Sequence, residues 1–131
     1  KDKDAAENVG AVDVYLTEEG KQDDLLKDLP DSFRAFVGHK ESCIKAPEST
    51  LVLARSKRCP VHMIRMGENV YGTQFHPEVD EDGLCVRIDV YTNEGYFKPE
   101  DAESSKRKVR QENITIPVIV LRRWVDKYKK Q

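Results

Sequence analysis

The stretch Val70-Tyr71-Gly72-Thr73-Gln74-Phe75-His76-Pro77-Glu78 determines how this sequence is interpreted. Pro77 fixes its own backbone angle and disfavours helical angles at His76, so an extended backbone is expected there. In an extended segment, residues two apart point to the same side, which would place Glu78 beside the imidazole of His76. A carboxylate bound to one ring nitrogen sets the tautomer and leaves the other nitrogen as a base. The stretch therefore predicts two members of a nucleophile–histidine–acid triad.

The rest of the sequence alternates strand-like and helix-like patterns, which is typical of an α/β domain. Val12, Val14 and Leu16 alternate with other residues, as in a strand with one buried face. Pro30 is expected to end a short helix, and Thr115 can cap a final one. The expected elements are strands at 12–16, 33–37 and 51–55, a helix at 23–29, a hairpin of 61–66 and 69–75, and a helix after residue 115.

Two segments have more than one interpretation. Residues 84–91 are rich in valine and isoleucine, which favours a strand, yet Leu84, Ile88 and Tyr91 fall on one helical face. Residues 98–113 carry little besides charge, and they predict either a surface loop or a polar helix of marginal stability.

Together with its flanks, the stretch at 70–78 resembles the His/Glu signature of the class-I (triad) glutamine amidotransferases. The resemblance covers roughly the whole chain, most closely residues 9–97, and it is closest to the GMP-synthase-like, stand-alone members. It includes the family's Gly-His segment at 36–41, two strands leading into the signature at 51–56 and 59–65, and the segment before the Gly-His motif at 9–16 with Glu19, Gly20, Leu25 and Leu26.

The resemblance implies a flavodoxin-like, three-layer α/β fold. Its sheet would be mixed, with an antiparallel hairpin and C-terminal helices, and a helix rather than a strand would follow the signature. The site would lie at the C-terminal edge of the strands, where open α/β sheets usually bind ligands.

The resemblance also implies that residues 1–131 are the C-terminal half of a single amidotransferase domain. The family's nucleophile is a cysteine in a Gly-x-Cys-x-Gly turn of the N-terminal half. None of Cys43, Cys59 and Cys85 has a glycine two residues away on both sides, since Gly83 precedes Cys85 but Arg87 follows it. The chain alone is therefore expected to be inactive. The strand edges of such a half would be unpaired, and exposed edges favour association between copies.

The function implied by the resemblance is glutamine amide transfer through a Cys-His-Glu triad. His76 would accept and return the proton, and Glu78 would orient His76. Glutamine would be hydrolysed, and its ammonia would pass to a synthase domain or subunit, without a metal or organic cofactor at the glutaminase step. The alternative is a non-catalytic remnant of the same fold that binds a partner or a small molecule.

Two further sets of residues allow a functional interpretation. His39, in the Gly-His segment, either faces the substrate or belongs to a turn. His39, Cys43, Cys59 and His62 have a spacing similar to that of zinc ligands, but a strand start between Cys59 and His62 would point them in different directions, so no metal is expected.

Composition excludes several classes of function. The formal net charge is −2, and the basic run at 106–110 follows an acidic run at 100–103 without interleaved aromatics, so no nucleic-acid surface is expected. No apolar run approaches membrane-spanning length, and no signal-peptide pattern begins the chain. Three cysteines without framework spacing indicate free thiols in a reducing compartment, and we expect a cytoplasmic protein.

Overall fold

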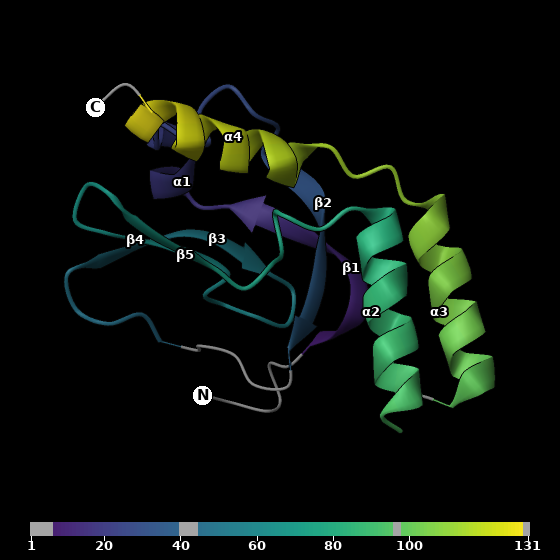
Figure 1. Cartoon of the computed structure of the whole chain (residues 1–131). Coiled ribbons are helices and arrows are strands. Elements are labelled where there is room, and N and C mark those ends of the chain that lie inside the picture. Colours follow the sequence, from purple (N-terminus) through teal and green to yellow (C-terminus); the bar gives the residue numbers. More distant parts are fainter. Residues whose placement is uncertain (1–6, 40–44, 96–97, 130–131) are drawn as a thin grey trace.

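The protein folds as a curled β-sheet flanked by helices (Figure 1). The structure is a computed structural model that describes residues 7–39, 45–95 and 98–129. In chain order its elements are β1 (Glu7–Leu16), α1 (Glu18–Gln22), β2 (Ser32–His39), β3 (Thr50–Ser56), β4 (Met63–Met66), β5 (Val70–Thr73), α2 (Glu81–Asn93), α3 (Pro99–Gln111) and α4 (Ile116–Lys129).

The sheet has the strand order β2-β1-β3-β4-β5, and its four neighbouring pairs are antiparallel. The predicted α/β class, the hairpin and the C-terminal helices are confirmed. The sheet differs in one respect from the expected mixed sheet, because the strands that the structure describes form antiparallel pairs only. Direct hairpin connections such as that between β4 and β5 produce antiparallel pairs, whereas parallel pairs need long crossovers.

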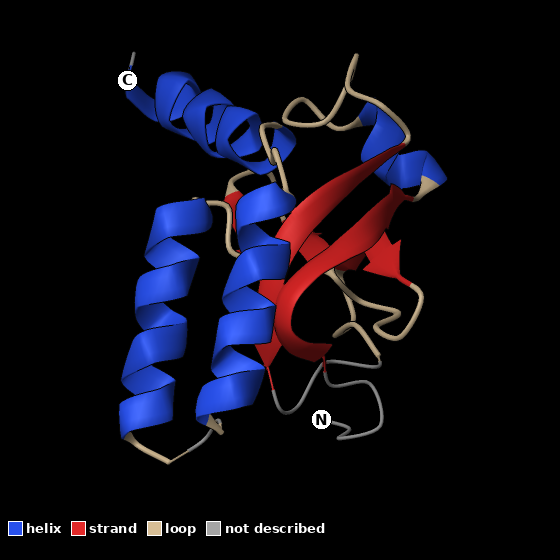
Figure 2. Cartoon of the chain, turned by 90° about the vertical axis from the view of Figure 1, so that its right-hand side faces the viewer, coloured by secondary structure: helices blue, strands red, loops and turns tan. Residues whose placement is uncertain are grey.

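Helices cover both faces of the sheet, which gives three layers. Successive side chains of a strand point to opposite faces, so Val14 and Leu16 of β1 pack into one core while Val9 and Ala11 pack against the other. The first core includes Val120 of α4, and the second includes residues of α2 and α3. Figure 2 shows α2 and α3 side by side against the curved strands.

The first helix lies earlier than predicted. The sequence favoured a helix at 23–29, but α1 spans Glu18–Gln22, and residues 24–28 form turns. Thr17 caps α1, since its hydroxyl accepts from the Gly20 amide at 3.0 Å. The left-handed φ of 66° at Asp28 interrupts any helix beyond it. Gly20 is required by packing, because a Cβ there would overlap the Leu53 carbonyl oxygen.

The two segments that allowed more than one interpretation from the sequence are both helical. Residues 84–91 lie in α2, as the family resemblance implied, and residues 99–111 form the polar helix α3 rather than a loop. Ala102 and Val109 of α3, seven residues apart on one helical face, are buried with Leu84 and Ile88 of α2. This packing stabilises a helix whose other residues are mostly charged or polar. Among the described residues, no helix is long and apolar enough to cross a membrane.

Candidate active site

The segment after β5 is held against the opposite edge of the sheet. The backbone amide of His76 donates to the Phe36 carbonyl of β2 at 2.9 Å, although β2 and β5 are the two outer strands. Phe75 is buried, with its ring stacked on His62 and edge-on to Phe33. The curl of the sheet and this anchored phenylalanine therefore fix the backbone of His76.

The side chains of His76 and Glu78 are in contact, as the sequence predicted, although residues 77–78 form a turn rather than the expected extended backbone. Nδ1 of His76 lies 3.1 Å from Oε1 of Glu78, and the side chains are 34% and 49% exposed. A carboxylate only accepts hydrogen bonds, so Nδ1 must carry the proton in this contact, and Nε2 of a neutral ring is then a base. The arrangement can accept a proton from a group that approaches Nε2.

A third side chain reaches the same carboxylate. Nη2 of Arg87, from α2, lies 3.5 Å from Oε1 of Glu78. Asp80 caps α2 through a 2.7 Å bond from the Gly83 amide, so the helix begins soon after Glu78. Nothing in the sequence pattern singled out Arg87, because an arginine nine residues after Glu78 faces it only if a turn and a helix intervene.

His39 and the cysteines of the zinc-like set have different outcomes. His39 is the last residue of β2, and its side chain, like Cys43, lies outside the described residues. Cys59 is buried, and its thiol donates to the Val61 carbonyl at 3.3 Å. Cys85, which is not part of that set, is also buried. Within the described ranges, no group of His, Cys, Asp or Glu side chains could hold a metal ion.

A buried ion network, which the sequence pattern did not predict, supports the hairpin that leads to His76. The side chain of Asp23 is fully buried and accepts from Arg65 at 2.7 Å and from the Tyr71 hydroxyl at 3.0 Å. Burial, followed by the nearby charge of Asp23, raises the pKa of Tyr71 to about 12. The partners are 42 and 48 residues apart in sequence, so no local pattern indicated them. The network connects the turn after α1 to the β4–β5 hairpin.

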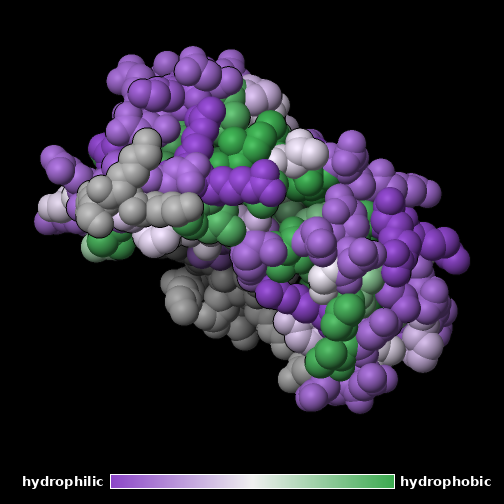
Figure 3. Space-filling view, turned by 45° about the horizontal axis from the view of Figure 1, so that its top comes forward, coloured by the Kyte–Doolittle hydropathy of each residue, from purple (hydrophilic) through white to green (hydrophobic). Residues whose placement is uncertain are grey.

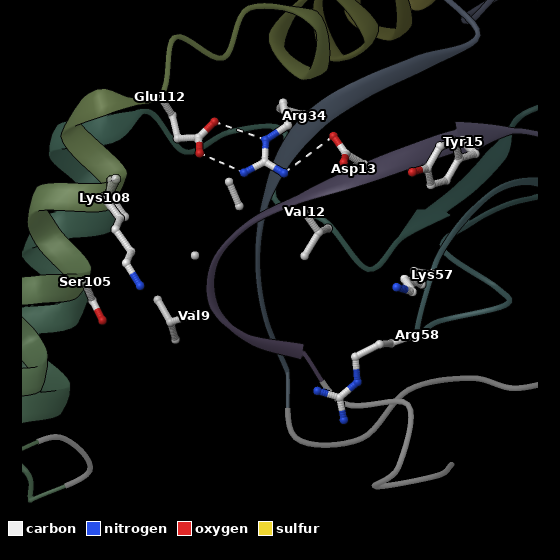
Figure 4. Close-up of a pocket in the computed structure, with 13 residues that line it drawn as sticks. Val9, Val12, Asp13, Tyr15, Arg34, Lys57, Arg58, Ser105, Lys108 and Glu112 are labelled. Carbon is white, nitrogen blue, oxygen red and sulfur yellow. Dashed lines mark hydrogen bonds and ion pairs between the residues drawn. The ribbon is translucent and has the colours of Figure 1, made fainter.

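A groove of about 620 Å³ lies between β1 and α3 (Figure 4). At one side of it, Arg34 makes a two-bond contact with Glu112, at 3.1 and 2.8 Å, and its guanidinium lies 3.5 Å from Asp13. The bond to Glu112 is the main cause that raises the pKa of Arg34. Lys57 and Lys108 also line the groove, and neither has an ion-pair partner among the residues described.

A second, more apolar hollow of about 390 Å³ lies beside the outer strand β5. It is lined by Val70 and Tyr71 of β5, by Pro77 of the signature and by Trp124 of α4. Val70 and Trp124 are exposed. On the face of the molecule shown in Figure 3, patches of apolar surface lie among polar side chains. Because β5 is an outer strand, one of its edges has no neighbouring strand among the described residues.

The fold and the site together define an α/β domain with a histidine–carboxylate pair at the edge of its sheet. The profile of the class-I glutamine amidotransferase family matches residues 3–83, more than half of the chain. The chain belongs to the class-I glutamine amidotransferase family.

Individual relatives agree with this assignment. A protein of Methanocaldococcus jannaschii, named as one subunit of a glutamine-hydrolyzing GMP synthase, is 39% identical over 75 residues, which are 56% of this chain and 38% of that protein. A glutamine-hydrolyzing GMP synthase from Thermosipho melanesiensis is 40% identical over 71 residues, 53% of this chain and 14% of that protein. The chain thus spans less than half the length of either relative.

A solved structure supports the fold. A glutamine amidotransferase from Thermotoga maritima superposes with a TM-score of 0.64 at 21% identity, over 94% of this chain and 51% of that one. The matching residues therefore form about half of that larger chain.

Proposed function

We propose that this chain supplies the histidine and the glutamate of a Cys-His-Glu triad that hydrolyses the side-chain amide of glutamine. The observation that carries the proposal is the 3.1 Å contact between Nδ1 of His76 and Oε1 of Glu78, which leaves Nε2 as a base. The family membership of the chain supports glutamine as the substrate.

The reaction needs one proton carrier and one nucleophile. Nε2 of His76 accepts the proton of a cysteine thiol, and the thiolate attacks the amide carbon of glutamine. The imidazolium, stabilised by Glu78, returns the proton to the departing nitrogen, so ammonia leaves and a glutamyl thioester remains. Water, deprotonated by the same imidazole, then hydrolyses the thioester to glutamate and the free thiol. His39, three residues after Phe36 in β2, is proposed to face the substrate.

The nucleophile is proposed to lie upstream of these residues, with residues 1–131 as the C-terminal half of one domain. Cys59 and Cys85 are buried, so neither is available to attack a substrate. The exposed edge of β5 and the apolar hollow beside Pro77 are consistent with a further segment that packs there. Because one relative is named as part of a GMP synthase, we propose that the ammonia passes to a synthase domain or subunit, in the cytoplasm.

Ammonia release from glutamine tests the proposal. The complete protein should turn over glutamine and should be labelled at an upstream cysteine by a thiol-reactive glutamine analogue. The 131-residue chain alone should release no ammonia above background. Turnover by the chain alone that is lost on changing Cys43, Cys59 or Cys85 would contradict the assignment of the nucleophile.

The groove between β1 and α3 favours a second candidate function, a non-catalytic binding module of the same fold. Lys57 and Lys108 on its walls could attract an anionic group, and about 620 Å³ is within the size range of small-molecule sites. The two candidates differ in one feature: a working amidotransferase requires an upstream Gly-x-Cys-x-Gly segment. A complete reading frame without it, together with no ammonia release, would favour the binding module.

A further inference from the structure

Arg87 and His76 contact the same oxygen atom of Glu78. Oε1 of Glu78 lies 3.1 Å from Nδ1 of His76 and 3.5 Å from Nη2 of Arg87. The three side chains come from two structural units, the segment after β5 and the helix α2. The side chain of Arg87 is 40% exposed, similar to those of its two neighbours. The contact is therefore a surface one, so its value for stability is small.

We propose that Arg87 is a positioning residue of the site, which holds the carboxylate of Glu78 in the orientation that keeps the proton of His76 on Nδ1. This inference rests on the proposed function. A glutamate that is half-exposed has several accessible rotamers, and ordering it has an entropic cost. A cation on a helix that is held by packing reduces that freedom through its contact with Glu78. Arginine suits this task because its planar guanidinium presents several donors to a carboxylate.

The position of Arg87 is fixed by packing. α2 begins at the Asp80 cap, and Leu84, Cys85 and Ile88 on its inner face are buried against α3. This anchoring leaves Arg87 on the face that is directed towards the signature.

Two other charged side chains of α2, Asp82 and Asp89, pair with α3 instead of with the signature. Asp82 pairs with Arg110 at 3.2 Å, and Asp89 pairs with Lys106 at 2.7 Å. Among the described residues of α2 and α3, Arg87 is the basic residue whose side chain forms an ion pair with Glu78.

The tautomer of His76 provides a test that does not depend on activity. Long-range ¹H–¹⁵N NMR of the complete protein distinguishes Nδ1–H from Nε2–H, and the His76 signal is assigned by its loss in His76→Ala. We expect a mainly Nδ1–H ring in the unmodified protein and in Arg87→Lys, and a larger Nε2–H fraction in Arg87→Ala and Arg87→Glu. Arg110→Ala is the matched control, because it removes an arginine from α3 that pairs with Asp82. Equal tautomer ratios in Arg87→Ala and Arg110→Ala would overturn the inference.

Kinetics provide the second test. Arg87→Ala should lower kcat of glutaminase by about two- to fivefold, equivalent to about 0.4–1 kcal/mol, and leave KM unchanged, because the contact is a surface one. In a Glu78→Gln background the same substitution should have no further effect, because the carboxylate it positions is gone. Equal fold losses of kcat in both backgrounds would overturn the positioning role. A complete protein without glutaminase activity would contradict the proposed function, while the tautomer measurement would still decide the role of Arg87.

Discussion

The carboxylates of Glu78 and Asp23 make their side-chain contacts in different settings. Glu78 meets His76 two residues away, and both side chains are partly exposed. Asp23 meets Arg65 and Tyr71 across 42 and 48 residues, and its side chain is fully buried. The first contact is made within the short turn after β5 and stays accessible to a reactant. The second can form only after the turn behind α1 and the β4–β5 hairpin have come together.

The difference between the two contacts concerns energy as well as sequence distance. An exposed pair contributes about 0–1 kcal/mol to stability, because water screens both charges. Removing one partner of a buried pair costs about 3–5 kcal/mol, because the other charge is left buried and uncompensated. We therefore expect substitutions at the exposed contact to change chemistry and substitutions at the buried network to change folding.

The largest effect is expected at His76. In the complete protein, His76→Ala should lower glutaminase turnover by about 10²–10⁴-fold, because a positioned base is removed. The melting temperature should change little, since the ring is partly exposed. Turnover is measured as ammonia release under saturating glutamine. Full activity in this variant would remove the catalytic interpretation and leave the binding module as the better proposal.

The second prediction concerns the buried network. Asp23→Ala should lower the free energy of unfolding by about 3–5 kcal/mol, because Arg65 and Tyr71 lose their buried acceptor. Asp24→Ala is a matched control, since Asp24 is exposed and its ion pairs within the described residues are with Lys27 at 3.4 Å and Lys127 at 3.8 Å. The control should cost less than about 1 kcal/mol. Urea unfolding of both variants measures the difference, and equal losses would show that the network is not a special source of stability.

A third prediction uses pH to separate the two regions. The pKa of Tyr71 is raised to about 12 in the folded protein, so the folded state keeps its proton where the unfolded chain, with an ordinary pKa of about 10, releases it. The stabilisation is therefore complete below pH 10 and is lost as the pH rises towards 12.

Tyr71→Phe should lower the free energy of unfolding by about 1 kcal/mol at neutral pH, because a hydrogen bond is lost. It should also reduce the alkaline loss of stability between pH 10 and 12. Tyr15→Phe, at an exposed position on β1, serves as the control. The network assignment fails if the two variants have the same stability–pH curves.

The smallest effect is expected on α3. Lys106 pairs with Asp89 at 2.7 Å and with Glu103 at 2.9 Å. The hydrogen bond to Asp89, followed by that to Glu103, raises the pKa of the Lys106 ammonium. Lys106→Ala should leave glutaminase turnover unchanged and lower stability far less than Asp23→Ala does, because exposed ion pairs contribute little. A loss of activity that is similar to that of His76→Ala would show that α3 takes part in the site.

Prediction from sequence was most accurate where a local rule decides the structure. The sequence at residues 76–78 predicted the contact between His76 and Glu78, although the structure makes it within a turn rather than an extended segment. The order of strands and helices predicted the α/β class. The first helix was misplaced because a turn with left-handed Asp28 and a buried Asp23 looks helical by composition alone. The choice between loop and helix at 99–111 depended on burial against α2, which charge-rich sequence does not reveal.

By itself, the sequence determined the family and the partnership of a histidine with a glutamate two residues on, because these depend on residues that are close in the chain. The tertiary structure alone decided which distant groups share a buried network, that the segment after β5 reaches β2, and that Arg87 meets Glu78. These contacts depend on the curl of the sheet and on which helix faces are buried. Many residues determine those features jointly, and no local pattern encodes them.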